Sequence, residues 1–164
     1  MNPSVYGEKP ATGIPVAPEP WSTGICHCSS DTTTWCITCW CPCITFGQIA
    51  EIVDKGTTSS TTSAALYFLI GTFTGCACMY SCFYRTKMRK QFNLQGSTCG
   101  DCMLHFCCER RALRQEYREL QHRGFDMAIG WQENKESENK GIAMAPKVQE
   151  GMFRDGHSVG PIRF

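Results

Sequence analysis

The stretch AALYFLIGTFTGCACMYSCFY, residues 64–84, has 21 residues and no charged side chain. An α-helix rises about 1.5 Å per residue, so a helix of this length covers roughly the hydrocarbon thickness of a bilayer. Its end is aromatic, and a basic cluster follows: Tyr80, Phe83, Tyr84, Arg85, Lys87, Arg89 and Lys90. That order is typical of a cytosolic membrane boundary, so the sequence predicts a membrane helix over about 64–84. The alternative is a buried helix of a soluble core.

Small residues occur within this stretch and just before it. Gly71 and Gly75 form a small-xxx-small pair, which predicts that another helix approaches closely there. Upstream, Lys55-Gly56 predicts a turn. The seven hydroxyl residues 57–63 predict a short polar loop and an N-cap for the helix.

A second uncharged run extends from Thr32 to Ala50, and Pro42 and Gly47 interrupt it. Its length predicts another membrane segment over about 36–53. The two segments then form a helical hairpin with both termini cytosolic. The predicted fold class is therefore a mainly α membrane protein, with a Cys-rich amphipathic cytosolic segment and disordered tails at 1–20 and 127–164.

One face of the first segment has a distinct composition. On a continuous helix, several small or sulfur-bearing residues and one acid fall within about 60° of one another. They are Cys36, Cys39, Cys43, Gly47, Ala50 and Asp54, with Glu51 beside them. Either these small residues permit tight helix packing, or the face lines a shared cavity in which Glu51 and Asp54 attract divalent cations.

A third segment, residues 85–126, contains a cluster of thiols and one imidazole. Cys99, Cys102, His105, Cys107 and Cys108 have the ligand types and short spacings of a structural zinc site. A second pair of ligands at the usual distance is missing, so acylated cysteines or thiols packed as core remain alternatives. Farther on, Leu113, Tyr117 and Leu120 stand at helical spacing, Gly124 suits the end of that helix, and the arginines suit an anionic lipid surface.

Composition and motifs exclude several classes of function. The formal net charge of +1 argues against a nucleic-acid partner. Enzymatic motifs such as GxSxG, HExxH and the P-loop do not occur, so we expect no enzyme and no catalytic cofactor. The 13 cysteines follow a Pro-rich start without an apolar signal-like core, which favours a reducing, cytosol-facing environment for most of them.

The sequence resembles the PLAC8 family. Its hallmark, CCxxxxCPC or CLxxxxCPC, is matched by WCITCWCPC at residues 35–43 and the following ITFGQIAEIVD at 44–54. The other matching segments are WSTGIC at 21–26, GCAC at 75–78, YSCFYR at 80–85, QEYREL at 115–120 and HRG at 122–124. Together they resemble the plant cadmium resistance branch over roughly residues 20–132. Trp35 departs from the first hallmark cysteine, and Arg111 stands where many relatives have a cysteine.

The resemblance implies a homo-oligomeric plasma-membrane protein that exports divalent cations, namely cadmium, zinc or calcium. It adds Cys41 to the metal-handling positions, together with Cys36 and Cys43. Relatives that regulate cell number or fruit weight imply the alternative, which is a non-transporting membrane regulator or chelator that acts through partner proteins. The expected partners are thus other copies of the chain, the lipid bilayer and regulatory proteins.

Overall fold

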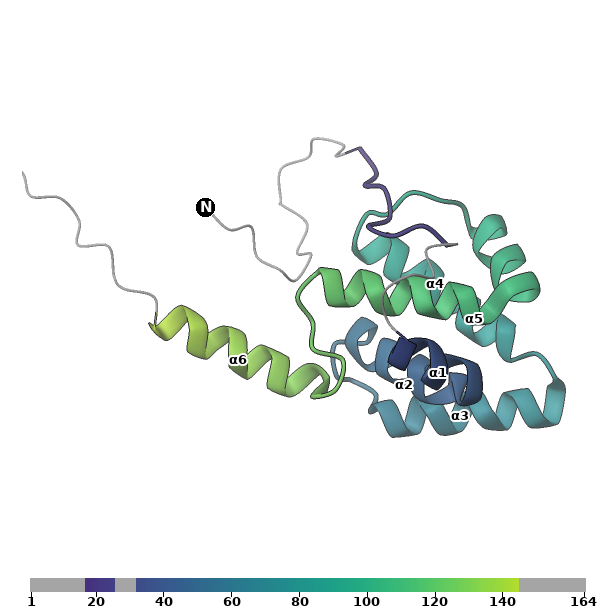
Figure 1. The fold of residues 1–164 in the computed structure, drawn as a ribbon, viewed down its shortest axis with the longest axis horizontal. Helices are drawn as coiled ribbons and strands as arrows, with labels where there is room; N and C mark the ends of the chain where they lie inside the picture. The colour runs from purple at the N-terminus through teal and green to yellow at the C-terminus, as the bar shows by residue number, and fades with distance from the viewer. Residues whose placement is uncertain (1–16, 26–31, 145–164) are drawn as a thin grey trace, which may run out of the picture.

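The computed structural model describes residues 17–25 and 32–144 (Figure 1). These residues form six helices and no strand; Glu19 and Leu94 make an isolated β-bridge. The helices are α1 (Thr32–Trp40), α2 (Pro42–Val53), α3 (Ser60–Thr74), α4 (Ala77–Gln91), α5 (Thr98–His122) and α6 (Gly130–Met144). The prediction of a mainly helical fold is confirmed.

The core is built around α2, which contacts all five other helices. Five of its twelve residues are buried and apolar: Phe46, Ile49, Ala50, Ile52 and Val53. The Phe46 ring stacks on Tyr67 of α3 at 4.8 Å between centroids and meets Tyr84 of α4 edge-on at 5.1 Å. Aromatic pairs in these geometries add stability beyond the area they bury. A helix predicted as a membrane segment is therefore the centre of the helical core.

The first predicted segment is not one helix. Its two parts, Thr34–Trp40 and Pro42–Val53, meet at an angle of 111°. Pro42 lies in the first turn of α2, where its missing N–H costs nothing and its fixed φ favours a new helix. The segment predicted over about 36–53 is therefore two helices, and the interruption expected at Pro42 is the start of the second one.

The second predicted segment is also divided. α3 ends at Gly75, which has a left-handed φ of +68°, and α4 begins at Ala77. A glycine in this conformation is a common helix terminator, and the Gly75 N–H donates to the Gly71 carbonyl at 3.1 Å. The prediction of a single helix over 64–84 is wrong for this reason.

No single helix in the described part of the chain has the length and apolar composition of a membrane span. The two helices Thr34–Trp40 and Pro42–Val53 have this length and apolar composition only when they are counted together as one bent pair.

The start of α3 agrees with the sequence. Lys55 and Gly56 both adopt positive φ, 55° and 72°, in the predicted turn. The Ser59 hydroxyl accepts a hydrogen bond from the Thr62 N–H at 3.3 Å. The hydroxyl-rich run thus supplies the predicted N-cap.

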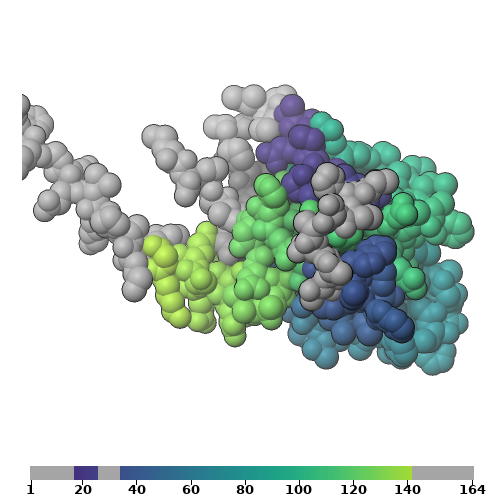
Figure 2. All heavy atoms as spheres, viewed as in Figure 1, coloured from purple at the N-terminus to yellow at the C-terminus, as the bar shows by residue number. Residues whose placement is uncertain are grey.

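Two segments predicted as tails are partly ordered. Glu19 bonds to the backbone of Asn93 and Gln95, both at 2.8 Å, and Figure 2 shows segment 17–25 lying against the bundle. At the other end α6 extends away from the bundle, while its Trp131 stacks on Phe125 at 6.0 Å. Tertiary contacts therefore order short polar stretches that have no apolar period of their own.

Candidate functional site

The thiols of the first predicted segment surround the α1–α2 bend. Cys36 and Cys41 are exposed, Cys39 and Cys43 are half-buried, and all four are free. The bend separates the α1 thiols from the line of α2, so the face predicted from Cys36 to Asp54 does not exist as one stripe.

The small residues of that face pack against a neighbouring helix. A Cβ on Gly47 would collide with the Ser60 carbonyl oxygen and lie 2.9 Å from the Ala64 Cβ. Ala50 is fully buried in the core. At these two positions the packing interpretation is confirmed.

Glu51 joins three elements through backbone hydrogen bonds. One carboxylate oxygen accepts from the Ser60 N–H at the start of α3 at 3.0 Å. The other accepts from the Trp131 N–H at the start of α6, also at 3.0 Å. Helix starts favour a negative charge because their first N–H groups have no partner within the helix. In this structure the Glu51 carboxylate holds helix ends.

Asp54 is paired as well. The Tyr84 hydroxyl donates to it at 2.9 Å, and the Lys87 ammonium forms an ion pair with its other oxygen. Both acids that were expected to attract cations thus have partners within the chain.

The five residues of the predicted zinc cluster do not converge. Cys102 forms a disulfide with Cys82 of α4, His105 is buried, and Cys99, Cys107 and Cys108 are exposed and free. Among the described residues no three His, Cys, Asp or Glu side chains are placed to hold a metal ion. A structural zinc does not fit this arrangement, since one thiol is oxidised and the imidazole is engaged elsewhere.

The two glycines of the predicted packing pair lie on either side of a helix end. A Cβ on Gly71 would lie 3.4 Å from the Ala77 Cβ, so Gly71 faces the start of α4 in ordinary contact. Nothing within the described residues lies within 4 Å of a Cβ built on Gly75. Gly71 and Gly75 therefore shape the α3–α4 turn in this structure.

The structure reveals a buried polar network between α4 and α5 that the sequence interpretation missed. Arg85 binds Asp101 at 3.2 Å, Glu116 at 3.1 Å and Gln115 at 2.7 Å, and its guanidinium lies 4.0 Å from the Trp21 ring centre. A residue expected at a membrane boundary is thus part of the interior.

His105 belongs to the same network. Its Nε2 lies 2.8 Å from Glu116 and its Nδ1 lies 2.9 Å from the Ser81 hydroxyl, which donates to Glu109 at 2.7 Å. Helical spacing could have revealed this face, because at 100° per residue Asp101, His105, Glu109 and Glu116 fall within about 80°.

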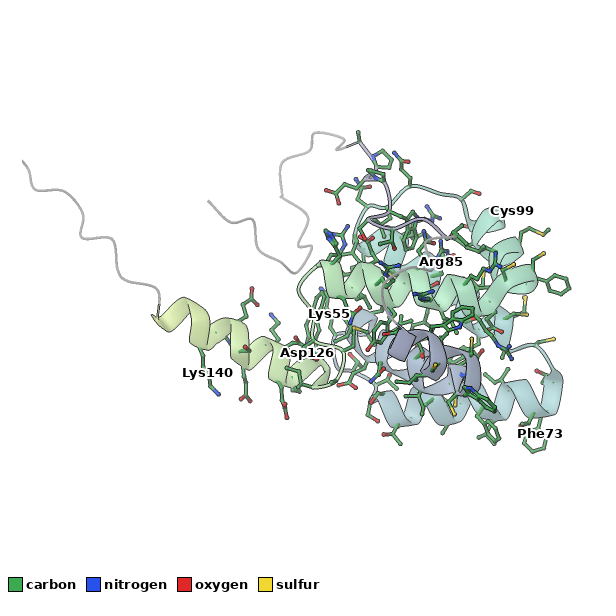
Figure 3. The ribbon with its side chains drawn as sticks, in the orientation of Figure 1. Lys55, Phe73, Arg85, Cys99, Asp126 and Lys140 are labelled. Atoms are coloured by element: carbon green, nitrogen blue, oxygen red, sulfur yellow. A yellow bond between two sulfur atoms is a disulfide. The ribbon has the colours of Figure 1, made fainter. Side chains whose placement is uncertain are left out.

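The surface carries many large apolar side chains. They lie on α1, the start of α2, α3, the first half of α4 and the first half of α5: Trp35, Ile37, Trp40, Ile44, Leu66, Phe68, Leu69, Phe73, Met79, Phe83, Met103 and Phe106. Residues 56–84 include no charged side chain, and Phe73 projects at the end of the bundle opposite α6 (Figure 3). Apolar exposure on this scale marks an interaction surface for a membrane or a protein.

Comparison with known proteins assigns the chain to a family. A family model described as "PLAC8 family" matches residues 21–119, so this chain belongs to the PLAC8 family.

Two relatives from Arabidopsis thaliana are named for cadmium resistance. The chain is 59% identical to "Protein PLANT CADMIUM RESISTANCE 2", over 85% of this chain and 94% of the relative. It is 55% identical to "Protein PLANT CADMIUM RESISTANCE 1", over 85% and 95%. From Zea mays, "Cell number regulator 9" is 47% identical over 92% of each chain. No solved structure matches.

Proposed function

We propose that the chain confers cadmium resistance as a homo-oligomeric plasma-membrane exporter of divalent cations, with cadmium and zinc as preferred substrates and calcium as a further one. The observation that carries the proposal is the set of four free thiols around the α1–α2 bend. They lie on or beside a helix pair that, alone among the described residues, has the combined length and apolar composition of a membrane span.

The donor type favours soft cations. Thiolates bind cadmium and zinc strongly, whereas calcium prefers oxygen ligands. Glu51 and Asp54 are bonded to other parts of the chain, so their carboxylates are not free to select the ion. Selectivity therefore rests on the thiols of the bend.

The number of thiols explains why several copies are needed. Among the described residues, one chain exposes Cys36 and Cys41 at the bend, while zinc in protein sites takes four ligands. Two or more copies arranged around a common axis supply a complete set.

The test is metal flux in liposomes that contain the purified full-length chain and an enclosed cadmium indicator. We expect flux down a cadmium gradient and its loss in the double variant Cys36→Ser/Cys41→Ser. The matched control is Cys99→Ser, which removes an exposed thiol from a different helix. The proposal fails if the wild-type chain shows no flux under any gradient, or if the double variant transports as fast as the control.

The alternative is a non-transporting regulator that chelates metal or acts through partner proteins. The similarity to proteins named as cell number regulators favours it. The two functions differ in the total metal of resistant cells. Export lowers cadmium per cell, whereas chelation leaves it unchanged and bound to protein.

A further inference from the structure

Two adjacent thiols, Cys107 and Cys108, are both exposed at a kink in α5. Cys108 has a non-helical backbone, with φ −143° and ψ 48°, so α5 changes direction there. Neighbours on a regular helix point about 100° apart. Here both thiols reach the surface and neither is in a disulfide.

Along α5, the exposed side chains change from apolar before the pair to basic after it. Before it, Phe106 is 78% and Met103 61% exposed. After it, Arg110 and Arg111 are exposed, and within the described residues neither guanidinium makes an ion pair. Apolar residues followed by unpaired arginines fit acyl chains on one side and anionic headgroups on the other.

A groove of about 620 Å³ lies beside the pair. Its walls come from α1, the α3–α4 turn and the kink of α5, with Trp35, Ala77 and Phe106 as apolar lining. Both thiols also line it. Glu109, Arg110 and Arg111 line it as well, so the groove is amphipathic and offers an attached acyl chain an apolar side at Trp35, Ala77 and Phe106.

We infer that Cys107 and Cys108 are sites of S-acylation by long-chain fatty acyl groups. Each Sγ attacks the carbonyl of a long-chain acyl thioester of coenzyme A. The Sγ–acyl bond forms as the acyl–coenzyme A sulfur bond breaks, and the thiol proton passes to the departing coenzyme A sulfur.

The pair provides two anchors at one place. A single acyl chain gives only weak, reversible membrane binding, whereas two chains, or one chain with basic residues, hold a protein stably. Cysteines on amphipathic helices beside a membrane are typical acylation sites. The two chains fix the first half of α5 in the cytosolic leaflet, with Arg110 and Arg111 at the headgroups. This inference rests on the membrane location in the proposed function but not on metal transport.

The test uses the tagged full-length chain expressed in plant cells. Free thiols are blocked, thioesters are cleaved with neutral hydroxylamine, and each released thiol receives a polymer label that slows the chain on a gel. We expect two hydroxylamine-dependent steps in the wild type and none in Cys107→Ser/Cys108→Ser. The matched control Cys76→Ser/Cys99→Ser, which removes two other exposed thiols, should keep both steps.

Mass spectrometry of the peptide containing residues 107 and 108 supplies a readout that does not depend on the folding of any variant. An acyl mass on this wild-type peptide supports the inference. A wild-type chain without hydroxylamine-dependent steps overturns it, as does a Cys107/Cys108 variant that retains both. Flux in liposomes is measured separately, so loss of transport and loss of acylation are distinguishable.

Discussion

Glu51 and Asp54 lie one helical turn apart near the end of α2, and their partners are distant in the sequence. Glu51 bonds to Trp131, 80 residues away, and Asp54 to Tyr84, 30 residues away. The sequence shows two acids beside an apolar run, and the same pattern is expected of acids that attract cations at the edge of a membrane. Only the fold shows that both carboxylates bind other groups of the same chain.

Replacing Glu51 should therefore reduce stability. Glu51→Ala removes two hydrogen bonds to a charged group, and we expect the free energy of unfolding to fall by about 2–3 kcal/mol. The measurement is the denaturant midpoint followed by tryptophan fluorescence. Glu136→Ala is the control, since Glu136 is exposed and pairs with Lys140 on the surface of α6 at 3.9 Å. Equal midpoints for the two variants would show that Glu51 holds no helix end.

Replacing Arg85 should lower the free energy of unfolding more than replacing an exposed arginine. Arg85→Met leaves Glu116 buried without its arginine and takes one of two arginines from Asp101, which keeps Arg89 at 2.9 Å. Breaking a buried ion pair costs about 3–5 kcal/mol. Arg110→Met, on the surface, should change stability little. Chemical denaturation of both variants measures the difference, and a tolerated Arg85→Met would contradict the role of the network.

At the level of helices, the sequence predicts helix content better than helix boundaries. Uncharged runs over 32–50 and 64–84 do become helices. Their division depends on Pro42 and Gly75, because each residue has two structural uses. Proline can interrupt a helix or begin one, and glycine can pack inside a helix or end it. Contacts across the bundle decide between these uses, and a single sequence does not contain them.

The predicted cysteine sites show the same limit. The spacing of Cys99, Cys102 and His105 suits a metal site. In the structure, however, Cys102 forms a disulfide with Cys82 of α4, and His105 hydrogen-bonds to Ser81 of the same helix. Local caps were easier to predict, because Ser59 bonds only three residues away.

Gly47 tests how closely α2 and α3 pack. Helix propensity alone predicts that Gly47→Ala stabilises by about 1 kcal/mol. The new Cβ would strike the Ser60 backbone oxygen, so we expect a net loss of stability instead. Gly141→Ala in α6 is the control, since its Cβ meets nothing within 4 Å among the described residues and should give the gain. Thermal unfolding shows the sign, and a stabilised Gly47→Ala would mean that the helices are farther apart.

The disulfide between α4 and α5 should stabilise their packing. Cys82 and Cys102 are 20 residues apart, and closing a loop of this length is worth about 3 kcal/mol. Reduction with dithiothreitol should lower the unfolding midpoint of the wild type. The Cys82→Ala/Cys102→Ser variant should begin at the lower value and not respond to the reductant. A wild-type unfolding midpoint that is the same with and without dithiothreitol would show that the disulfide does not contribute to stability.

The whole molecule has two ends of different character. The α3–α4 turn and the first half of α5 expose aromatic residues, whereas α6 at the other end is mostly polar and exposed (Figure 1). Lipid contact at the first end would cover side chains such as Phe73, which is 84% exposed. The uncharged surface thus defines which side of the bundle meets the membrane in the proposed function.

Two tryptophans can report whether the exposed apolar surface or the start of α6 contacts lipid. Trp40 is 86% exposed on α1, and Trp131 is 7% exposed at the start of α6. Brominated lipid tails quench only tryptophans that reach the acyl chains, so we expect them to quench wild-type fluorescence in vesicles. Trp40→Phe should lower the quenched signal to the part that comes from Trp35, which is 37% exposed on the same helix. Trp131→Phe should leave the quenched signal unchanged because its ring packs on Phe125. The reverse result would place the α6 end in the bilayer and overturn this orientation.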